Sequence, residues 1–471
     1  MTGRPPARRR SGPAGRRPGP ARPAQRREAD PARRVAYDLL RAVDERDAYA
    51  NLTLPALLRE RGLTGRDAAF ATELTAGTVR MRGLYDAVVG PLVTRPLADL
   101  DPQVLDVLRL GCHQLLSMRT PSHAAVSSSV DLVRVRVSRR PSGLVNAVLR
   151  KVASDDLDGW VARVAPDRAD DPLGHLAVRH SHPRWIVDAL HEAMGRDLDE
   201  TERLLAADNE PPSVTLVARP GRSTVDELLV EGATRGQWSP YAVCLAGGNP
   251  ADIPAVREGR AGVQDEGSQL VAMALAQAPL DGADARWLDL CAGPGGKAAL
   301  LTGLAGERGG LLLANDRLPH RARLVLRAVA GALSARVVVA DGTRPAWRPE
   351  WFDRVLLDAP CTGLGALRRR PEARWRRQPT DVRPLAELQA RLLDSAVEST
   401  RPGGIVAYAT CSPHLAETRE IVTARQARDD VELVDARQVL PDLPDQPDPW
   451  LQLWPHRHGT DAMYVALLRR R

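Results

Sequence analysis

Two cysteines stand directly behind apolar segments that have the composition of buried strands. Cys361 follows the segment FDRVLLDAP (352–360), and Cys411 follows GGIVAYAT (403–410). The chain has only five cysteines, and one alone would most simply be a small buried hydrophobic residue. Two thiols at the ends of two strands instead indicate chemistry, because a thiolate adds reversibly to an electrophilic carbon.

The reaction that needs such thiols is methylation of carbon 5 of a pyrimidine. That carbon is a poor nucleophile until a group has added to C6, and a thiolate is the side chain best suited to this addition. An acid near N3 of the base would assist the reaction. Asp358 lies three residues before Cys361, so we expect both side chains in the same pocket.

A glycine-rich turn follows another strand-like segment, RWLDLC. Its residues are Cys291, Ala292, Gly293, Pro294, Gly295, Gly296 and Lys297. Such a turn lets the backbone approach a ligand closely and aims a helix N-terminus at it. It is not a Walker P-loop, because Cys291 occupies the place of the leading glycine and Ala298 the place of the Ser/Thr after the lysine.

The turn alone fits an NAD-type cofactor and S-adenosylmethionine equally, and a plain glycine-rich turn is the simplest structural alternative. Asp316, about 20 residues beyond the turn, could bind ribose hydroxyls in either case. The paired thiols favour S-adenosylmethionine, because a nicotinamide enzyme has no general need for them. Lysine usage also indicates a ligand site here. All but two of the 66 basic residues are arginine, and one of the two lysines is Lys297.

Strands and helices alternate in the C-terminal part of the chain. The expected strands are 286–291, 310–316, 335–341, 352–360, 403–410, 431–436 and 461–468, and the expected helices are 296–306, 320–333, 382–400 and 416–427. This alternation predicts βαβ units on a mainly parallel, doubly wound sheet, with ligands at the carboxyl ends of the strands. Three of these strands end in an acid, at Asp316, Asp341 and Asp358.

The sequence divides into four regions of different composition. Residues 31–165 have the apolar spacing of an all-α domain, in which Asp101 and Pro102 form a helix start. Residues 170–262 combine helical segments with short strands and turns, which predicts a small α+β connecting module. Residues 263–471 form the predicted Rossmann-like α/β domain.

The fourth region is the tail of residues 1–30, which is rich in Arg and Pro. Residues 1–34 hold eleven arginines against Glu28 and Asp30, a local charge of +9 in a chain whose formal net charge is +7. We expect a disordered tail that helps to hold a polyanion such as RNA. The alternative is a solvated low-complexity tail that reflects a GC-rich genome.

Composition also excludes several classes of protein. The chain contains no C-x-x-C pair, which argues against a disulfide framework and against a zinc site of the usual spacing. His456 and His458 resemble a metal pair only superficially, so we expect no metal. No apolar run approaches the roughly 18 residues of a membrane span, and the N-terminus is unlike a secretory signal. We therefore expect a cytoplasmic monomer with no membrane partner.

Four motifs together resemble the Sun/Fmu family of bacterial 16S ribosomal RNA cytosine-5 methyltransferases. They are DLCAGPGGK, LLDAPCTGLGALRRRPEARW, YATCS and PHRHGTDAMYVALL. The resemblance covers the whole chain, because the N-terminal helical region is similar to the NusB-type RNA-binding domain of this family and HSHPRWIV to its connecting segment. It implies S-adenosylmethionine as cofactor and unassembled 16S ribosomal RNA as partner. Transfer RNA as substrate and a non-catalytic RNA-binding or antitermination factor are the alternatives.

The resemblance also implies roles for single residues. Residues 291–297 would surround the methionine part of the cofactor, Asp316 its ribose and Asp341 its adenine, while Asp358 would lie between cofactor and base. In enzymes that methylate DNA cytosine the thiol of the Pro-Cys segment attacks, but this RNA family assigns attack to the Thr-Cys thiol. Cys411 would therefore be the nucleophile and Cys361 would assist product release.

Six arginines surround a tryptophan in the segment LRRRPEARWRR (367–377). Arginines beside an aromatic ring suit phosphate contact and base stacking on an unpaired strand. We expect RNA contacts from Arg368, Arg369, Arg370, Arg374 and Trp375, and a solvated loop is the alternative. Because the target base must leave any stack to reach a thiol, the expected substrate is a loop of the RNA.

Overall fold

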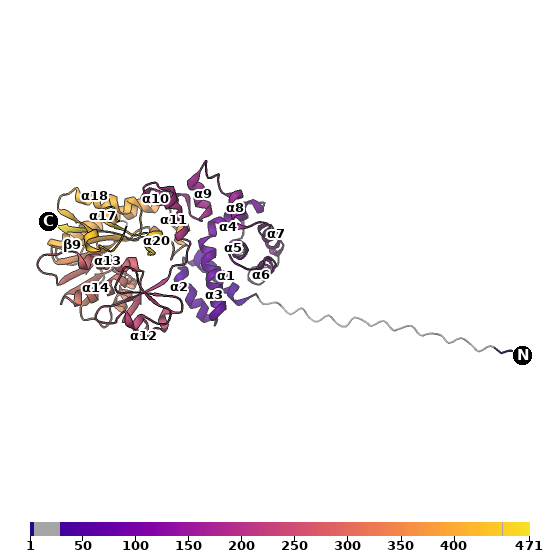
Figure 1. The fold of residues 1–471 in the computed structure, drawn as a ribbon, viewed down its shortest axis with the longest axis horizontal. Coiled ribbons are helices and arrows are strands. Elements are labelled where there is room, and N and C mark those ends of the chain that lie inside the picture. Colours follow the sequence, from indigo (N-terminus) through magenta and orange to yellow (C-terminus); the bar gives the residue numbers. More distant parts are fainter. Residues whose placement is uncertain (4–28, 445) are drawn as a thin grey trace.

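The computed structural model describes residues 1–3, 29–444 and 446–471. The predicted disordered tail of residues 1–30 lies almost entirely outside the described residues. The first helical region, at the right of the folded part of Figure 1, has one large apolar core. It is built from α1 (Pro31–Arg46), α2 (Ala50–Glu60), α3 (Gly65–Arg80), α4 (Arg82–Val89), α5 (Pro102–Leu116), α6 (Ser122–Arg136), α7 (Ser142–Val152) and α8 (Leu157–Val164).

The start of α5 is the one predicted from the sequence. The carboxylate of Asp101 accepts a hydrogen bond from the backbone N–H of Gln103, and Pro102 occupies the first helical position. Asp30 and Pro31 begin α1 in the same way. An Asp cap satisfies an N–H group that the first turn leaves free, and proline lacks that group altogether.

A second helical segment and a small sheet follow. The helices are α9 (Pro172–Arg179), α10 (Arg184–Ala193) and α11 (Leu198–Ala207), and their apolar faces share a core with Leu364, Leu367 and Trp454 from much later in the chain. The sheet is antiparallel in the order β2-β3-β1-β4, with β1 (Val214–Ala218), β2 (Thr234–Arg235), β3 (Ala242–Leu245) and β4 (Ala261–Val263), and the short α12 (Pro254–Arg257) precedes β4. The connecting region is thus α+β, as predicted.

The C-terminal part is a Rossmann-like α/β domain around an eight-stranded sheet. Its order is β10-β12-β9-β8-β5-β6-β7, and β11 pairs with β12. The strands are β5 (Arg286–Asp289), β6 (Leu311–Asn315), β7 (Ala335–Val338), β8 (Phe352–Asp358), β9 (Thr400–Thr410), β10 (Val431–Val434), β11 (Leu451–Gln452) and β12 (Tyr464–Arg470). All pairs between β5 and β9 are parallel, and β12 runs antiparallel to both neighbours. The predicted mainly parallel sheet is confirmed.

Helices cover both faces of this sheet, and Figure 1 shows α17 and α18 on one side and α13 and α14 on the other. The helices are α13 (Glu266–Gln277), α14 (Gly296–Gly306), α15 (Pro319–Ala328), α16 (Ala373–Arg376), α17 (Val382–Ser399), α18 (Arg419–Gln426), α19 (Ala436–Val439) and α20 (Pro455–His458). Strands covered on both faces become continuous apolar runs, and residues 352–357 of β8 are all buried.

Five of the helices and strands of this domain are absent from the prediction, namely α13, α16, α19, α20 and β11. Helices α16, α19 and α20 have only four residues each, which is about one turn and too short for a helical pattern. Helix α13 is buried along nearly its whole length, so its sequence lacks the one-sided apolar spacing that distinguishes a surface helix. Strand β11 has only two residues, which is too short for a period-2 pattern.

Candidate active site

The carboxyl ends of the five neighbouring parallel strands form one edge of the sheet. Asp358 of β8 pairs in register with Ala409 of β9, so the loops that carry Cys361 and Cys411 leave the sheet side by side. Two adjoining cavities lie at this edge. One of about 280 Å³ is lined by Asp316 and Asp341, and one of about 570 Å³ by Asp358 and both cysteines. Cys291, Arg321 and Pro360 line both cavities.

The glycine-rich turn borders both cavities and packs too closely to accept larger residues. A Cβ atom at Gly293 would lie 2.3 Å from a carboxylate oxygen of Asp316. Gly295 has φ of +112°, and a Cβ there would lie 2.7 Å from the Cβ of Ala328. Glycine is required at these two positions because the backbone passes directly against α15 and the Asp316 carboxylate.

The acids of the smaller cavity are held by backbone groups. Asp316 accepts hydrogen bonds from the N–H of Gly293 (3.0 Å) and of Leu318 (2.8 Å). Asp341 accepts from the N–H and the hydroxyl of Thr343, and these bonds hold the pKa of its carboxyl below the usual value. Both carboxylates are therefore fixed at the wall of the smaller cavity.

A further acid in this area was not predicted. The side chain of Asp289, at the end of β5, is fully buried, and neither carboxylate oxygen has a hydrogen-bond partner among the described residues. Burial, and next the negative charge of Asp358, raise the pKa of Asp289 to about 8. Asp289 is the first residue of the motif DLCAGPGGK, but nothing in the sequence distinguishes it from an ordinary acid; only its burial in the structure does.

Lys297 forms an ion pair between the turn and the thiol loop. Its ammonium lies 2.9 Å from the carboxylate of Asp358, and its side chain is only 12% exposed. Burial alone would lower the pKa of Lys297, but the charge and the hydrogen bond of Asp358, together with the nearby Cys411 and Asp289, raise it above the usual value. A compact ammonium fits this buried position, whereas the planar fork of an arginine is larger and has a different geometry.

The two thiols are neighbours, with 3.4 Å between Sγ of Cys361 and Sγ of Cys411. A hydrogen bond from Cys361 lowers the pKa of Cys411, and the nearby positive charges of Lys297 and Arg370 act in the same direction. The same contact, together with burial, raises the pKa of Cys361. Cys411 is thus the thiol that ionises first, and Cys361 is the one that keeps its proton.

A buried network fixes the two thiol loops to each other. Glu417, which is fully buried, accepts hydrogen bonds from the N–H (2.8 Å) and the hydroxyl of Thr362 and from the amide of Gln389. Thr362 also contacts the hydroxyl of Ser412 at 3.0 Å. Because Thr362 follows Cys361 and Ser412 follows Cys411, the network sets the separation of the sulfurs. None of these four residues was predicted.

The structure corrects the RNA-contact prediction for three arginines. Arg374 is fully buried and donates to the carbonyls of Arg80, Ser181 and Asp208 and to the side chain of Asn209. Arg369 pairs with Asp265 and Asp461, and Arg368 donates to the carbonyl of Gly459. Their guanidinium groups are occupied within the protein, because the segment joins the C-terminal domain to the helical regions.

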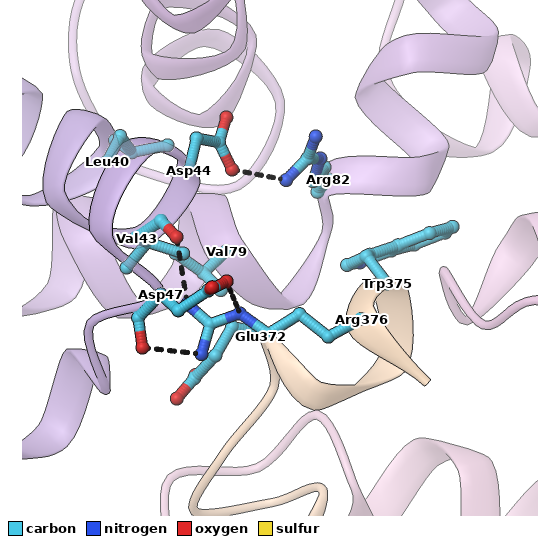
Figure 2. A pocket seen from close by; sticks show the side chains of 9 residues that line it. All are labelled: Leu40, Val43, Asp44, Asp47, Val79, Arg82, Glu372, Trp375 and Arg376. Atoms are coloured by element: carbon cyan, nitrogen blue, oxygen red, sulfur yellow. Dashed lines mark hydrogen bonds and ion pairs between the residues drawn. The ribbon is translucent and has the colours of Figure 1, made fainter. Parts of the chain in front are cut away.

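Trp375 also lies in this junction. It lines a cavity of about 170 Å³ between α1 and α16, and Figure 2 shows its ring below Arg82. A Cβ on Gly83 would lie 2.3 Å from its ring. Arg370 differs from its neighbours because it lines the larger cavity beside the thiols. Of the five predicted RNA contacts, Arg370 therefore has the position that fits the prediction best.

The histidines near the C-terminus have protein partners. His456 contacts Glu200 at 2.9 Å, and the backbone N–H of Trp454 donates to the ring of His458. Among the residues that the structure describes, no group of three His, Cys, Asp or Glu side chains is arranged to hold a metal ion. No helix in the described part of the chain is long and apolar enough to cross a membrane.

Comparison with known families gives two matches. Residues 274–469 match the model described as 16S rRNA methyltransferase RsmB/F, and residues 30–154 match the NusB family. A Mycobacterium tuberculosis protein named "Putative methyltransferase" is 54% identical over 96% of this chain and 99% of its own length. Ribosomal RNA small subunit methyltransferase B of Vibrio cholerae is 32% identical over 93% of this chain and 96% of its own length.

Solved structures share the fold. The crystal structure of PH0851 superposes with a TM-score of 0.78 at 23% identity and covers 93% of this chain and 98% of its own. NSun6 from Pyrococcus horikoshii with SFG has a TM-score of 0.52 at 17% identity and covers 61% of this chain and 98% of its own.

Proposed function

Because the chain belongs to the RsmB/F family of 16S rRNA methyltransferases and carries a NusB-family domain, we propose that it methylates carbon 5 of a cytosine in 16S ribosomal RNA. The family makes the chain an S-adenosylmethionine-dependent RNA methyltransferase. Beyond the family assignment, the proposal specifies cytosine as the base, carbon 5 as the methylated atom and a covalent intermediate with a cysteine.

The observation that carries the proposal is the pair of thiols 3.4 Å apart in the larger cavity, which adjoins the cavity lined by Asp316 and Asp341. Methylation of an amino group or a hydroxyl requires no thiol, because those acceptors already have a lone pair. Carbon 5 of cytosine gains its electron pair only after addition at C6. A thiol of lowered pKa with a protonated thiol beside it matches both the addition and its reversal.

The residues around the two cavities would bind S-adenosylmethionine. The cofactor supplies an electrophilic methyl group. Asp316 would accept hydrogen bonds from the ribose, Asp341 would lie on the adenine side, and the backbone of residues 291–297 would approach the methionine part. Gly293 and Gly295 let the turn pack against Asp316 and α15, where a larger residue would clash.

The proposed path on the RNA begins with Cys411. Its thiolate adds to C6, so that a C–S bond forms and the electron pair moves to C5, which then accepts the methyl group. Asp358 supports N3 of the base. A proton acceptor then removes the proton from C5. The electron pair of that C–H bond restores the C5–C6 double bond, the C6–S bond breaks, and the thiolate of Cys411 leaves. Cys361 assists this last step, because its S–H donates to the departing sulfur.

The test uses unmodified 16S ribosomal RNA transcribed in vitro and S-adenosylmethionine labelled in its methyl group. After digestion to nucleosides, we expect the label in 5-methylcytidine for the unaltered chain and no label for Cys411→Ala. Transfer RNA serves as the competing substrate. Label in another nucleoside, or in transfer RNA but not in 16S ribosomal RNA, would contradict the proposal.

A further inference from the structure

The cavity that holds the thiols is completed by the N-terminal domain. Asp47 and Tyr49, from the loop that joins α1 to α2, line the same 570 Å³ cavity as Cys361 and Cys411. More than 300 residues separate the loop from the thiols along the chain. The wall that faces the catalytic strands is therefore built by the domain that is otherwise associated with RNA docking.

The C-terminal domain fixes the shape of this loop. Arg376 donates to the backbone carbonyls of Val43 (2.8 Å), Asp47 (3.1 Å) and Ala48 (2.7 Å). Figure 2 shows its guanidinium between Val43 and Asp47, with α1 on one side and the segment of Glu372 on the other. These bonds hold backbone groups, so the loop keeps its conformation whatever its side chains are.

The stability of the loop does not explain why residue 49 is a tyrosine. It occupies the N-cap position of α2 without a capping side-chain hydrogen bond, where Ser, Thr, Asp or Asn would stabilise the helix. Its side chain is 44% exposed, and its hydroxyl has no hydrogen-bond partner in the described part of the chain. A large, exposed aromatic ring at the edge of a catalytic cavity is a candidate for ligand contact.

The neighbours of Tyr49 favour a nucleic-acid base as that ligand. The guanidinium of Arg370 lies 4.9 Å from the centre of its ring, and that of Arg376 lies 5.7 Å away. Arg370 forms no ion pair with a carboxylate among the described residues, so its charge is available to a phosphate. An aromatic ring with an adjacent arginine is the arrangement that holds unpaired bases in RNA-binding proteins.

We propose that Tyr49 and Arg370 form a platform for an unpaired nucleotide of the RNA, beside the cytosine that enters the thiol pocket. Tyr49 stacks on the base and Arg370 contacts the phosphate. The N-terminal domain thereby contributes a binding residue to the catalytic cavity and takes part in the choice of nucleotide. This inference rests on the proposed function, because it requires an RNA strand in the cavity.

The first experiment compares Tyr49→Leu with Tyr49→Phe in the full-length chain, with in vitro transcribed 16S ribosomal RNA as the probe. Loss of one stacked base should raise KM for the RNA by about tenfold in the leucine variant, since stacking contributes about 1 to 3 kcal/mol per base. The phenylalanine variant keeps the ring and should match the unaltered chain. The value of kcat, the affinity for S-adenosylmethionine and Tm should stay unchanged in both. An unchanged KM in a folded leucine variant would overturn the inference and leave the proposed function intact.

The second experiment uses the unaltered chain, so it does not depend on the folding of any variant. The chain is cross-linked to the same RNA with ultraviolet light and then digested with trypsin. We expect a cross-linked nucleotide on the peptide of residues 47–59, which contains Tyr49. Cross-links found only in other peptides would contradict the inference. If the unaltered chain transfers no methyl group to RNA, the proposed function fails, and the inference fails with it.

Discussion

The contact between the two sulfurs makes the thiols of Cys411 and Cys361 unequal. The hydrogen bond from Cys361 is the main cause of the lowered pKa of Cys411. Lys297, which pairs with Asp358, and Arg370 lower it further, against the opposing effects of burial and of the Asp358 charge. Cys361 keeps its proton because the neighbouring sulfur and burial raise its pKa. A thiol is a nucleophile only as the thiolate, so under the proposed function this asymmetry assigns attack to Cys411 and release to Cys361.

The division of roles predicts different products for the two alanine variants. Cys411→Ala should form neither 5-methylcytidine nor a covalent complex, because no thiolate attacks C6. Cys361→Ala should still attack and methylate, but its slower release should accumulate a protein–RNA complex that survives denaturing electrophoresis. Both can be measured with labelled 16S ribosomal RNA. An adduct in the Cys411 variant but not in the Cys361 variant would reverse the assignment.

The buried carboxyl of Asp289 predicts a dependence of stability on pH. Its pKa in the folded protein is about 8, well above the value of about 3.9 in an unfolded chain. The folded state therefore binds this proton more tightly, and its contribution to stability is lost as pH rises through that interval. Without cofactor, raising the pH from about 5.5 to about 8 should destabilise the unaltered chain by up to about 3 kcal/mol relative to Asp289→Asn.

Thermal or urea unfolding of both proteins across this pH range measures the difference. Asp281→Asn is the matched control, because that side chain is fully exposed. Parallel curves for the unaltered chain and Asp289→Asn would show that Asp289 is charged in the folded protein and would refute the assignment.

Some elements of the active site can be predicted from the sequence, and others cannot. Segments such as 352–360 are predictable because a strand buried on both faces is mainly apolar, even though β8 also buries Asp353 and Arg354. The turn at 291–297 is predictable because its glycines have few other uses. From these elements the strand-end positions of Asp316, Asp358 and Cys411 follow directly. The network around Glu417 does not follow, because a buried glutamate has the same letter as an exposed one.

The segment of residues 367–377 also shows that composition does not reveal which side chains are buried. Its arginines have the composition of an RNA-binding loop, but α16 places Arg374 among backbone carbonyls. Composition cannot distinguish a guanidinium that contacts phosphate from one that satisfies carbonyl groups, because both use the same N–H donors. The position of Tyr49 in the catalytic cavity is equally invisible in the sequence, since it depends on how two distant regions pack.

The buried contacts of Arg374 predict a large loss of stability on truncation. Arg374→Ala leaves the carbonyls of Arg80, Ser181 and Asp208 without this donor, and an unsatisfied buried group costs about 1 to 3 kcal/mol. The free energy of unfolding should fall by at least about 3 kcal/mol. Arg383→Ala is the control, because Arg383 is 89% exposed and makes only a surface pair with Glu387. Equal unfolding curves for the two variants would contradict the structural role of Arg374.

At the scale of the whole molecule, the positive charge of the protein is concentrated at its N-terminus. Residues 1–34 have a net charge of +9, so the remainder is close to −2. We predict that deletion of residues 1–28 weakens binding of 16S ribosomal RNA mainly at low salt, because a basic tail acts through counterion release. Binding measured over a range of salt concentrations should give a smaller slope for the truncated chain, with unchanged kcat. An identical slope would leave the tail without a role in RNA binding.

The contacts of Arg374 and Arg376 also have a consequence for how the protein is made. Translation delivers the helical regions first, and domains generally fold as they leave the ribosome. The carbonyls of Val43, Arg80 and Ser181 are then exposed to water until the segment around α16 has been synthesised. The nascent N-terminal domain can thus fold and meet RNA before it has a catalytic partner, whereas the wall that it shares with the thiols is assembled only late in translation.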